Sequence, residues 1–265
     1  MPQLTLADVD LHYEVYGAGE PLVLIPGFAA GAWIWFKQID PLAKKFRVIT
    51  FDPRGIGESS FKGEAITMQL LANDTAALLQ ALGIERAHIL GVSFGGFVAQ
   101  DFALAYPGAT RSLSLCCTSF GGPKHVAPSL DTLTAVLSTD GFNTEARIRR
   151  NLMPAFSPDF VRTHPAEVDE VIKLRLENPI VEEAYRAQLA AGLGFNAELR
   201  VGAIKAPTLV LSGDADAIVP AQNSRNLAEQ IPGARLRLVA GGSHLFFIEQ
   251  ADDFNRIVVE FLEKN

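Results

Sequence analysis

The sequence predicts a protein of the α/β class, in which a mostly parallel central sheet is flanked by helices. Two observations carry this prediction. Short, continuous apolar runs, which are typical of strands buried on both faces, alternate along the chain with helical patterns. The alternation stops after residue 117 and resumes near residue 207, and the stretch between contains short helical patterns separated by prolines. We therefore expect a sheet core that is interrupted by an insertion of helices.

The predicted strands are recognised by their apolar side chains. Residues 9–15 alternate between apolar and polar side chains, which predicts a half-buried antiparallel strand. The runs at residues 21–25 and 47–51 are short, continuous and apolar, so we expect these two strands to be covered on both faces. Further strands are expected at residues 87–90, 111–117, 207–211 and 235–239.

Helical patterns fill the segments between these strands. Thr67 is placed to cap a helix from Met68 to Leu82, and Gly83 follows as its stop signal. Other core helices are expected at residues 33–42, 220–230 and 247–262. In the insertion, two apolar stripes recur at helical spacing: Val168, Val171, Ile172 and Leu176, and then Val181, Ala184, Tyr185 and Leu189.

The composition argues against two classes of partner, nucleic acids and membranes. The net charge of −7 and the lack of basic clusters beyond Lys44–Lys45 and Arg147–Arg150 argue against a nucleic-acid partner. We interpret Arg147, Arg149 and Arg150 as a solvated helix face. No apolar stretch reaches the roughly 18 residues of a membrane helix, and the first residues lack a signal-peptide pattern. We therefore expect a cytoplasmic protein that does not contact a membrane.

The chain has two cysteines, Cys116 and Cys117, which are neighbours on a predicted strand. Successive side chains of a strand point to opposite faces, so this pair is not expected to form a disulfide. We interpret both as small buried hydrophobic residues. With no other cysteine there is no thiolate zinc site, and we expect neither a metal nor an organic cofactor.

A sharp turn joins one predicted strand to the helix that ends at Tyr106. The turn has Gly91 and Gly95 two residues to either side of Ser93, which is the G-x-S-x-G spacing of a nucleophile elbow. Such a turn strains the backbone and exposes the serine hydroxyl. It also brings strand and helix so close together that only glycine fits beside the serine.

A nucleophilic serine needs a general base, and the base needs an orienting carboxylate. In a parallel sheet, all three groups should lie on loops at the carboxyl ends of strands. Asp214 and Asp216 follow the predicted strand at 207–211, and His244 follows the strand at 235–239. The order Ser, Asp, His fits this architecture. The other histidines lie on strands or in the insertion and are poorer candidates for the base: His12, His88, His125 and His164.

With these motifs in place, the chain resembles the α/β-hydrolases, in particular the single-domain esterase, lactonase and peroxidase-like group. The resemblance extends over nearly the full length and is specific for the fold, but much less specific for the substrate. The matching segments are Pro26–Phe28, Asp52–Ser59, Gly91–Gly95, Gly213–Asp216 with Val219–Pro220, and Gly242–His244.

The resemblance implies a role for each matching residue. Ser93 would be the nucleophile, His244 the general base, and Asp216 the carboxylate that orients the imidazole. Asp216 is preferred because the family acid lies three residues after the loop glycine, and Asp214 remains the alternative. The backbone N–H groups of Phe28 and Phe94 would form the oxyanion hole.

Two further family positions are informative. Asp52 and Arg54 match family residues that we interpret as scaffold, with a turn-stabilising ion pair as their expected role. The family usually carries His-Gly at the start of the oxyanion loop, where this chain has Pro26-Gly27. That histidine is not the catalytic base, so the triad is complete without it, but the assignment to a subclass is weakened.

The resemblance also divides the chain into a core at residues 1–118 and 199–265 and a helical cap at 119–198. Few charged residues lie near the motifs, so we expect a small to medium, mainly hydrophobic ester or lactone as substrate. A strongly anionic substrate is less expected. The side chains expected to line the pocket are Trp33, Phe120, Leu137, Phe142, Phe156 and Leu245.

Other functions are compatible with the same motifs. Carbon–carbon bond hydrolysis and cofactor-free perhydrolysis would use the same three residues. A regulatory or ligand-binding protein with slow turnover would keep them and use the cap to present a ligand to a partner. The oligomeric state, monomer or homodimer, is left open by the sequence.

Overall fold

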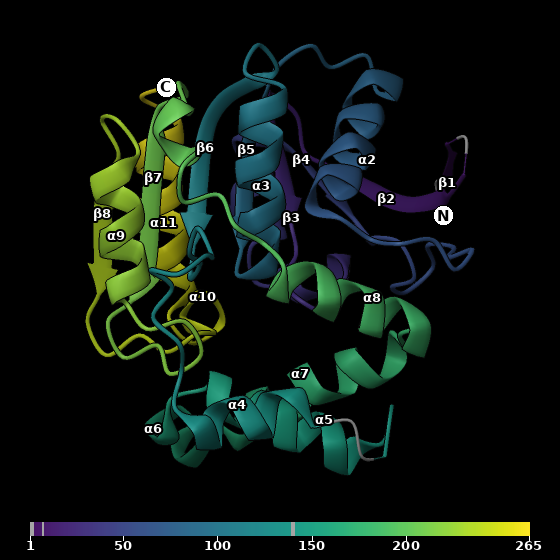
Figure 1. Cartoon of the computed structure of the whole chain (residues 1–265), viewed down its shortest axis with the longest axis vertical. Helices are drawn as coiled ribbons and strands as arrows, with labels where there is room; N and C mark the ends of the chain where they lie inside the picture. Colours follow the sequence, from purple (N-terminus) through teal and green to yellow (C-terminus); the bar gives the residue numbers. More distant parts are fainter. Residues whose placement is uncertain (1–2, 7, 139–140) are drawn as a thin grey trace.

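The computed structural model describes residues 3–6, 8–138 and 141–265, and Figure 1 shows the course of the chain. Its centre is an eight-stranded sheet in the order β1-β2-β4-β3-β5-β6-β7-β8. The strands are β1 Gln3–Thr5, β2 Asp10–Tyr16, β3 Glu20–Ile25, β4 Phe46–Phe51, β5 Ala87–Val92, β6 Thr110–Cys116, β7 Thr208–Gly213 and β8 Arg235–Val239.

The sheet is mostly parallel, as expected from the sequence. β2 pairs antiparallel with β1 and β4, whereas every pairing from β4 through β3, β5, β6 and β7 to β8 is parallel. β5 and β7 are buried along their whole length, which explains their continuous apolar runs. β1 was not expected from the sequence, because its three residues are too few to show a pattern.

Helices cover both faces of the sheet. The core helices are η1 Ala32–Trp35, α1 Ile39–Ala43, α2 Met68–Ala81, α3 Phe94–Ala105, η3 Val201–Ala203, α9 Gln222–Gln230, α10 Phe246–Glu249 and α11 Ala251–Leu262. The Thr67 side chain accepts a hydrogen bond from the N–H of Leu70, which confirms the predicted cap of α2. The predicted helix at 33–42 is instead the short pair η1 and α1, and the predicted final helix is divided at Gln250, where the backbone is not helical.

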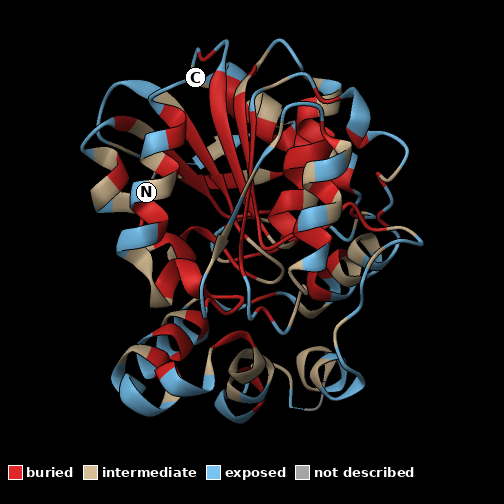
Figure 2. Ribbon diagram, turned by 90° about the vertical axis from the view of Figure 1, so that its left-hand side faces the viewer, coloured by how far each residue is buried: buried red, intermediate tan, exposed pale blue. Residues whose placement is uncertain are grey.

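Because successive side chains of a strand point to opposite faces, each face of the sheet has its own hydrophobic core. Leu22 and Leu24 of β3 join the cluster formed with η1, α1, α10 and α11, whereas Val23 and Ile25 join the cluster formed with α2, α3 and α9. Figure 2 shows the buried strands enclosed between these two layers.

The stretch between β6 and β7 forms a separate group of helices. Figure 1 shows most of them below the sheet, at the edge toward which the parallel strands point. They pack against the core through the same hydrophobic cluster that contains η1 and α11. The elements are α4 Leu130–Leu137, α5 Glu145–Leu152, η2 Met153–Ala155, α6 Pro158–Thr163, α7 Pro165–Glu177 and α8 Glu182–Leu193. We refer to α4 through α8 as the cap helices.

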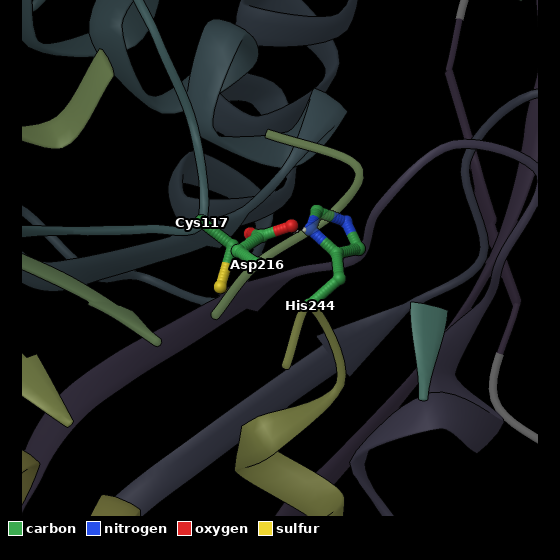
Figure 3. Close-up of side chains that lie close together, drawn as sticks. All are labelled: Cys117, Asp216 and His244. Carbon is green, nitrogen blue, oxygen red and sulfur yellow. Dashed lines mark hydrogen bonds and ion pairs between the residues drawn. The ribbon is translucent and has the colours of Figure 1, made fainter. Parts of the chain in front are cut away.

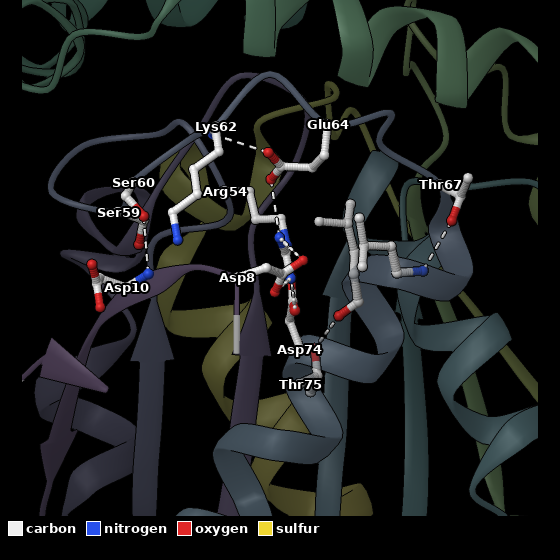
Figure 4. A network of polar contacts seen from close by, with 12 residues as sticks. Asp8, Asp10, Arg54, Ser59, Ser60, Lys62, Glu64, Thr67, Asp74 and Thr75 are labelled. Atoms are coloured by element: carbon white, nitrogen blue, oxygen red, sulfur yellow. Dashed lines mark hydrogen bonds and ion pairs between the residues drawn. The ribbon is translucent and has the colours of Figure 1, made fainter. Parts of the chain in front are cut away.

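Arg54 is buried and lies at the centre of an ionic network, which Figure 4 shows. Its guanidinium donates to Asp74 at 2.5 and 2.7 Å, to Asp8 at 2.8 and 3.0 Å, and to Glu64 at 3.0 Å. Burial alone would lower the pKa of Arg54, but these three carboxylates raise it. The network ties the loop after β4 to α2 and to the N-terminal segment.

The expected ion pair between Asp52 and Arg54 was wrong. Asp52 turns the other way and accepts hydrogen bonds from the backbone N–H groups of Ala32 at 2.8 Å and Glu58 at 3.1 Å. Both residues are therefore scaffold residues, as expected, but each holds a different part of the loop.

Among the described residues, no helix is long and apolar enough to cross a membrane.

Candidate active site

Ser93 lies at the turn between β5 and α3. Its backbone has φ 55°, a conformation that is strained for a residue with a side chain. Neighbouring groups hold this conformation. The N–H of Ser93 donates to the carbonyl oxygen of Cys116 at 2.8 Å, and its own carbonyl oxygen accepts from the N–H of Gly96 and the hydroxyl of Thr118. The turn has the strained strand-to-helix geometry that the sequence predicted for a nucleophile elbow.

The flanking glycines have the predicted steric role. A Cβ at Gly91 would lie 2.2 Å from the carbonyl oxygen of Gly95. A Cβ at Gly95 would lie 2.3 Å from the carbonyl oxygen of Ile25 and 2.4 Å from that of Pro26. These contacts are with backbone atoms, which cannot move aside without shifting β3 or α3.

His244 and Asp216 are hydrogen-bonded to each other. The distance between Nδ1 of His244 and Oδ2 of Asp216 is 2.8 Å, and both side chains are buried. The other carboxylate oxygen of Asp216 accepts from the N–H groups of Ile218 and Val219, each at 2.8 Å. The carboxylate is thus fixed in position and can orient the imidazole, with the proton on Nδ1 and a free acceptor at Nε2.

Asp214 has a different partner. Its carboxylate accepts a hydrogen bond from the N–H of Gly241 at 2.7 Å and is exposed to solvent. The two loops meet through glycines, because a Cβ at Gly213 would lie 2.0 Å from the carbonyl oxygen of Gly242. Of the two candidate acids, Asp216 is the one in contact with His244.

Cys117 adjoins this pair. Figure 3 shows its side chain beside Asp216 and His244, and one ligand atom from each of the three lies within 4.8 Å of the others. Burial and the nearby Asp216 carboxylate raise the pKa of the Cys117 thiol, so the sulfur stays protonated. Since Nδ1 of His244 is already bonded to Asp216, the cluster is an acid–base pair beside a neutral thiol, and its donors do not fit a metal. Both cysteines are buried and unpaired, as predicted.

A cavity of about 170 Å³ lies between the sheet and the cap helices. Ser93 and His244 both line it, so the structure brings the predicted nucleophile and base to one space. Its core side also includes Phe28, Trp33 and Leu245. The complete lining is Gly27, Phe28, Ala29, Ala30, Trp33, Ile34, Val92, Ser93, Val136, Arg147, Ile148, Asn151, Leu152, Ala155, Arg175, Tyr185, Ile218, His244, Leu245 and Phe247.

Four side chains that were expected in the pocket lie outside its lining: Phe120, Leu137, Phe142 and Phe156. Phe120 is 1% exposed and packs in the hydrophobic cluster that includes residues of α2, α3 and α9. Phe156 is stacked on Phe160, with an interplanar angle of 5°. On α4, Val136 lines the cavity in place of Leu137, because neighbouring helical residues point about 100° apart. Phe142 packs edge-on against Tyr185, one layer behind the cavity wall.

The cap contributes polar residues that the sequence analysis missed. Arg147 of α5 and Arg175 of α7 line the cavity together with Asn151 and Tyr185. Arg147 was expected on a solvated face, but only 3% of it is exposed. One signal was available: Arg147 and Asn151 are four residues apart, immediately beside the apolar pair Ile148 and Leu152, and such neighbours share one side of a helix.

The predicted oxyanion donors lie beside the serine. Phe94 is the first residue of α3, and within the described residues the N–H groups of Phe28 and Phe94 donate to no other group of the chain. The loop that carries Phe28 is held from the cap, because the N–H of Ala29 donates to Oε1 of Gln188 at 3.1 Å. Ala29 itself has φ 58°, so the loop is a strained turn.

Comparisons with known proteins identify the family of this chain. The family model of the alpha/beta hydrolase fold matches residues 20–251. A putative carbamate hydrolase RutD of Azorhizobium caulinodans is 31% identical over 98% of each chain. A 2-hydroxy-6-oxononadienedioate/2-hydroxy-6-oxononatrienedioate hydrolase of Burkholderia vietnamiensis is 32% identical over 97% of this chain and 92% of that protein. The crystal structure of the enol-lactonase from Burkholderia xenovorans matches with a TM-score of 0.87 and 27% identity, over 99% of this chain and 100% of that chain.

Proposed function

Since this chain belongs to the alpha/beta hydrolase fold family, we propose that it is a serine hydrolase that cleaves a carboxylic ester or lactone through an acyl-enzyme on Ser93. One observation carries the proposal: Ser93, on its strained elbow, faces the same cavity as His244, whose imidazole is held by Asp216. Acyl transfer needs a nucleophile, a general base and an orienting acid, and these three residues are of the types that fill those roles.

In the first half of the reaction, Ser93 Oγ attacks the substrate carbonyl carbon while its proton passes to Nε2 of His244. The carbonyl π electrons move to oxygen and give a tetrahedral oxyanion. As this intermediate collapses, the carbon–oxygen bond to the leaving alcohol breaks and the imidazolium returns the proton to that oxygen. The products are an ester of Ser93 and a free alcohol, which stays attached to the acyl group if the substrate is a lactone.

In the second half, water takes the place of the alcohol. His244 removes a proton from water, the hydroxide oxygen attacks the acyl carbon, and the proton returns to Ser93 Oγ as the acid leaves. The carboxylate of Asp216 stabilises the imidazolium in both halves. Its two hydrogen bonds from Ile218 and Val219 keep it in place.

The oxyanion is stabilised by the N–H groups of Phe28 and Phe94. Neither N–H has another acceptor among the described residues, so both are available to the substrate oxygen. Phe94 also begins α3, and the positive end of a helix dipole favours the developing negative charge. Removal of one such donor costs about 2.7–4 kcal/mol of transition-state stabilisation in other hydrolases.

A second candidate is the hydrolysis of a carbon–carbon bond next to a ketone. It is favoured by the 32% identity to a hydrolase of 2-hydroxy-6-oxononadienedioate and 2-hydroxy-6-oxononatrienedioate. The same residues would act, but the leaving group would be a carbon acid. Turnover of a vinylogous 1,5-diketone at a rate far above that of any ester would favour this candidate over the first.

The proposal is tested by covalent labelling with a fluorophosphonate, which reacts with activated serines. Wild-type protein should gain one adduct, and peptide mass spectrometry should locate it on Ser93. The Ser93→Ala protein should gain none and should lose at least about 10³-fold in kcat toward esters. Labelling of another serine, or ester turnover by Ser93→Ala at the wild-type rate, would overturn the assignment.

A further inference from the structure

Two buried arginines face the catalytic cavity from the cap. Arg147 and Arg175 are 3% and 7% exposed, and both belong to the lining that includes Ser93 and His244. Arginine is rarely buried without an anionic partner, because removing its charge from water is costly. No carboxylate of the described residues forms an ion pair with either guanidinium.

The contacts of Arg147 leave part of its guanidinium unused. Its Nε donates to the carbonyl oxygen of Ser138 at 2.7 Å. Its guanidinium carbon lies 4.4 Å from the ring centroid of Phe142 and 4.8 Å from that of Tyr185. Its Nη2 is buried, and no group of the described residues accepts a hydrogen bond from it.

Arg175 also has only neutral partners. Its Nη1 donates to the carbonyl oxygen of Asn178 at 2.9 Å and its Nη2 to Oδ1 of Asn143 at 3.3 Å. Burial and the nearby positive charge of Arg147 lower the pKa of Arg175 to about 10, so it remains charged at neutral pH. Two neighbouring cations are thus buried, and no carboxylate of residues 3–6, 8–138 and 141–265 pairs with either of them.

A purely structural role accounts for only some of these contacts. Stacking on two aromatic rings explains why the flat faces of the Arg147 guanidinium are covered. Stacking does not explain why Nη2 of Arg147 has no acceptor, and it does not explain why a second arginine is buried beside the first. A neutral side chain of similar size would fill the same space without the desolvation cost.

We infer that the cavity binds substrates that carry a carboxylate group, which Arg147 and Arg175 recognise while Ser93 attacks an ester or lactone carbonyl of the same molecule. The planar guanidinium matches a carboxylate with two parallel hydrogen bonds. The indole N–H of Trp33, which is also buried without a partner in the described chain, is a third donor on the cavity wall. This inference rests on the proposed function and narrows its substrate, which the sequence led us to expect as mainly hydrophobic.

A binding measurement tests the inference without relying on catalysis. The Ser93→Ala protein is titrated by calorimetry with monomethyl esters of the diacids from succinate to adipate, and with the corresponding dimethyl esters. At the best chain length, we expect the monoanion to bind at least about tenfold more tightly than the neutral diester, as charge-assisted hydrogen bonds predict. Equal or weaker binding of every monoanion would overturn the inference, even if Ser93 proves to be the nucleophile.

A kinetic measurement then assigns the effect to the arginines. The ratio of kcat/KM for mono-p-nitrophenyl adipate to that for its neutral 6-carboxamide analogue is compared between proteins. Arg147→Gln should lower this ratio about 10- to 100-fold. Arg147→Lys keeps the positive charge but loses the planar pair of N–H donors, so its ratio should lie between those of Arg147→Gln and wild type. A structural role would lower both rates alike and leave the ratio unchanged, and that result would also overturn the inference.

The matched control is Arg149→Gln on the same helix. Arg149 is partly exposed and pairs with Glu145 and Asp169, so its charge is already balanced. The ratio should stay at the wild-type value. A fall as large as that of Arg147→Gln would show that general charge, rather than the buried cluster, sets the preference, and would contradict the inference.

Discussion

The cavity that Ser93 and His244 line has two walls, which are built in different ways. On the core wall, backbone groups hold Ser93 and the carboxylate of Asp216, and glycines bring the chain segments into close contact. On the cap wall, the residues facing the cavity are long side chains such as Arg147, Arg175 and Tyr185. The core wall is held by backbone contacts, and we propose that it supplies the chemistry. The cap wall depends on side-chain packing, and we propose that it selects the substrate.

The two walls are joined by a few hydrogen bonds. The N–H of Leu245, the residue after His244, donates to the carbonyl oxygen of Ala155 at 2.9 Å. The N–H of Ser157 donates to the carboxylate of Glu249 at 2.7 Å, and Gln188 accepts from the oxyanion loop. These hydrogen bonds fix the position of the cap relative to Leu245 and Ala29.

The largest effect is expected from the core wall at Asp216. Asp216→Asn keeps the size of the side chain but removes the charge that stabilises the imidazolium, so kcat should fall about 10³- to 10⁴-fold. Asp214→Asn is the matched control, since its carboxylate contacts Gly241 and not the imidazole. Steady-state ester hydrolysis measures both. Similar losses in the two variants would show that the acid has been misassigned.

The rigidity of the core wall can be tested at Gly95. In Gly95→Ala, the added methyl would meet the backbone oxygens of Ile25 and Pro26, so the free energy of unfolding should fall by about 3–5 kcal/mol. Gly108→Ala is the control, because no atom lies within 4 Å of its added Cβ, and its effect should stay within about 0.5 kcal/mol. Urea denaturation measures both. Equal stabilities would mean that the elbow is not tightly packed.

The core and the cap also differ in the charge state of a buried basic residue: His88 in the core is neutral, whereas Arg175 in the cap is charged. Burial, with a smaller effect of nearby Arg111 and Arg86, lowers the pKa of His88 to about 4, so the folded core keeps this residue neutral. In the unfolded chain its pKa is about 6.5. Above pH 6.5 both states are neutral; as the pH falls from 6.5 toward 4, the unfolded state takes up the proton first, and stability should drop by about 3 kcal/mol.

This loss is measured as the difference in unfolding free energy between pH 7 and pH 4. His88→Asn should remove about 3 kcal/mol of the pH dependence, whereas the same change at the exposed His164 should leave it in place. An unchanged pH dependence in His88→Asn would contradict the assignment of the effect to His88.

The smallest effect is expected at the contact between the walls. Gln188→Leu removes the acceptor that holds Ala29, so the oxyanion loop should relax and kcat should fall about tenfold, or about 1.4 kcal/mol. KM should change little, because Gln188 does not line the cavity. The exposed Gln222→Leu serves as the control. A change in KM alone would show that Gln188 acts on substrate binding and not on the loop.

The contrast between the walls also explains what could be predicted from the sequence. The elbow, the acid loop and the histidine loop depend on local rules: an apolar run ends, a glycine permits a close approach, and a polar residue follows. Ser93 and His244 could therefore be placed at one edge of the sheet. The choice of Asp216 over Asp214 needed the family resemblance, and the hydrogen bond to His244 now supports it.

The cap could be predicted only as a set of helices. Whether a helical side chain faces the cavity depends on how the helix is rotated, and the apolar stripes of cap helices do not fix that rotation. Phe142 and Phe156 were thus expected in the pocket but pack behind it, whereas Arg147 was expected in solvent and is buried. The spacing of Arg147 and Asn151 beside Ile148 and Leu152 was the available signal, but it does not show what that side of the helix packs against.

The central claim, that the core wall forms an acyl-enzyme on Ser93, is tested most directly by a single-turnover reaction with p-nitrophenyl esters from acetate to octanoate. The quenched protein is examined by intact mass spectrometry. We predict a burst of p-nitrophenol and one acyl adduct on wild-type protein, with a chain-length dependence set by the cavity, and neither on Ser93→Ala. An adduct of equal amount on Ser93→Ala, or p-nitrophenol release without an adduct on either protein, would contradict the account.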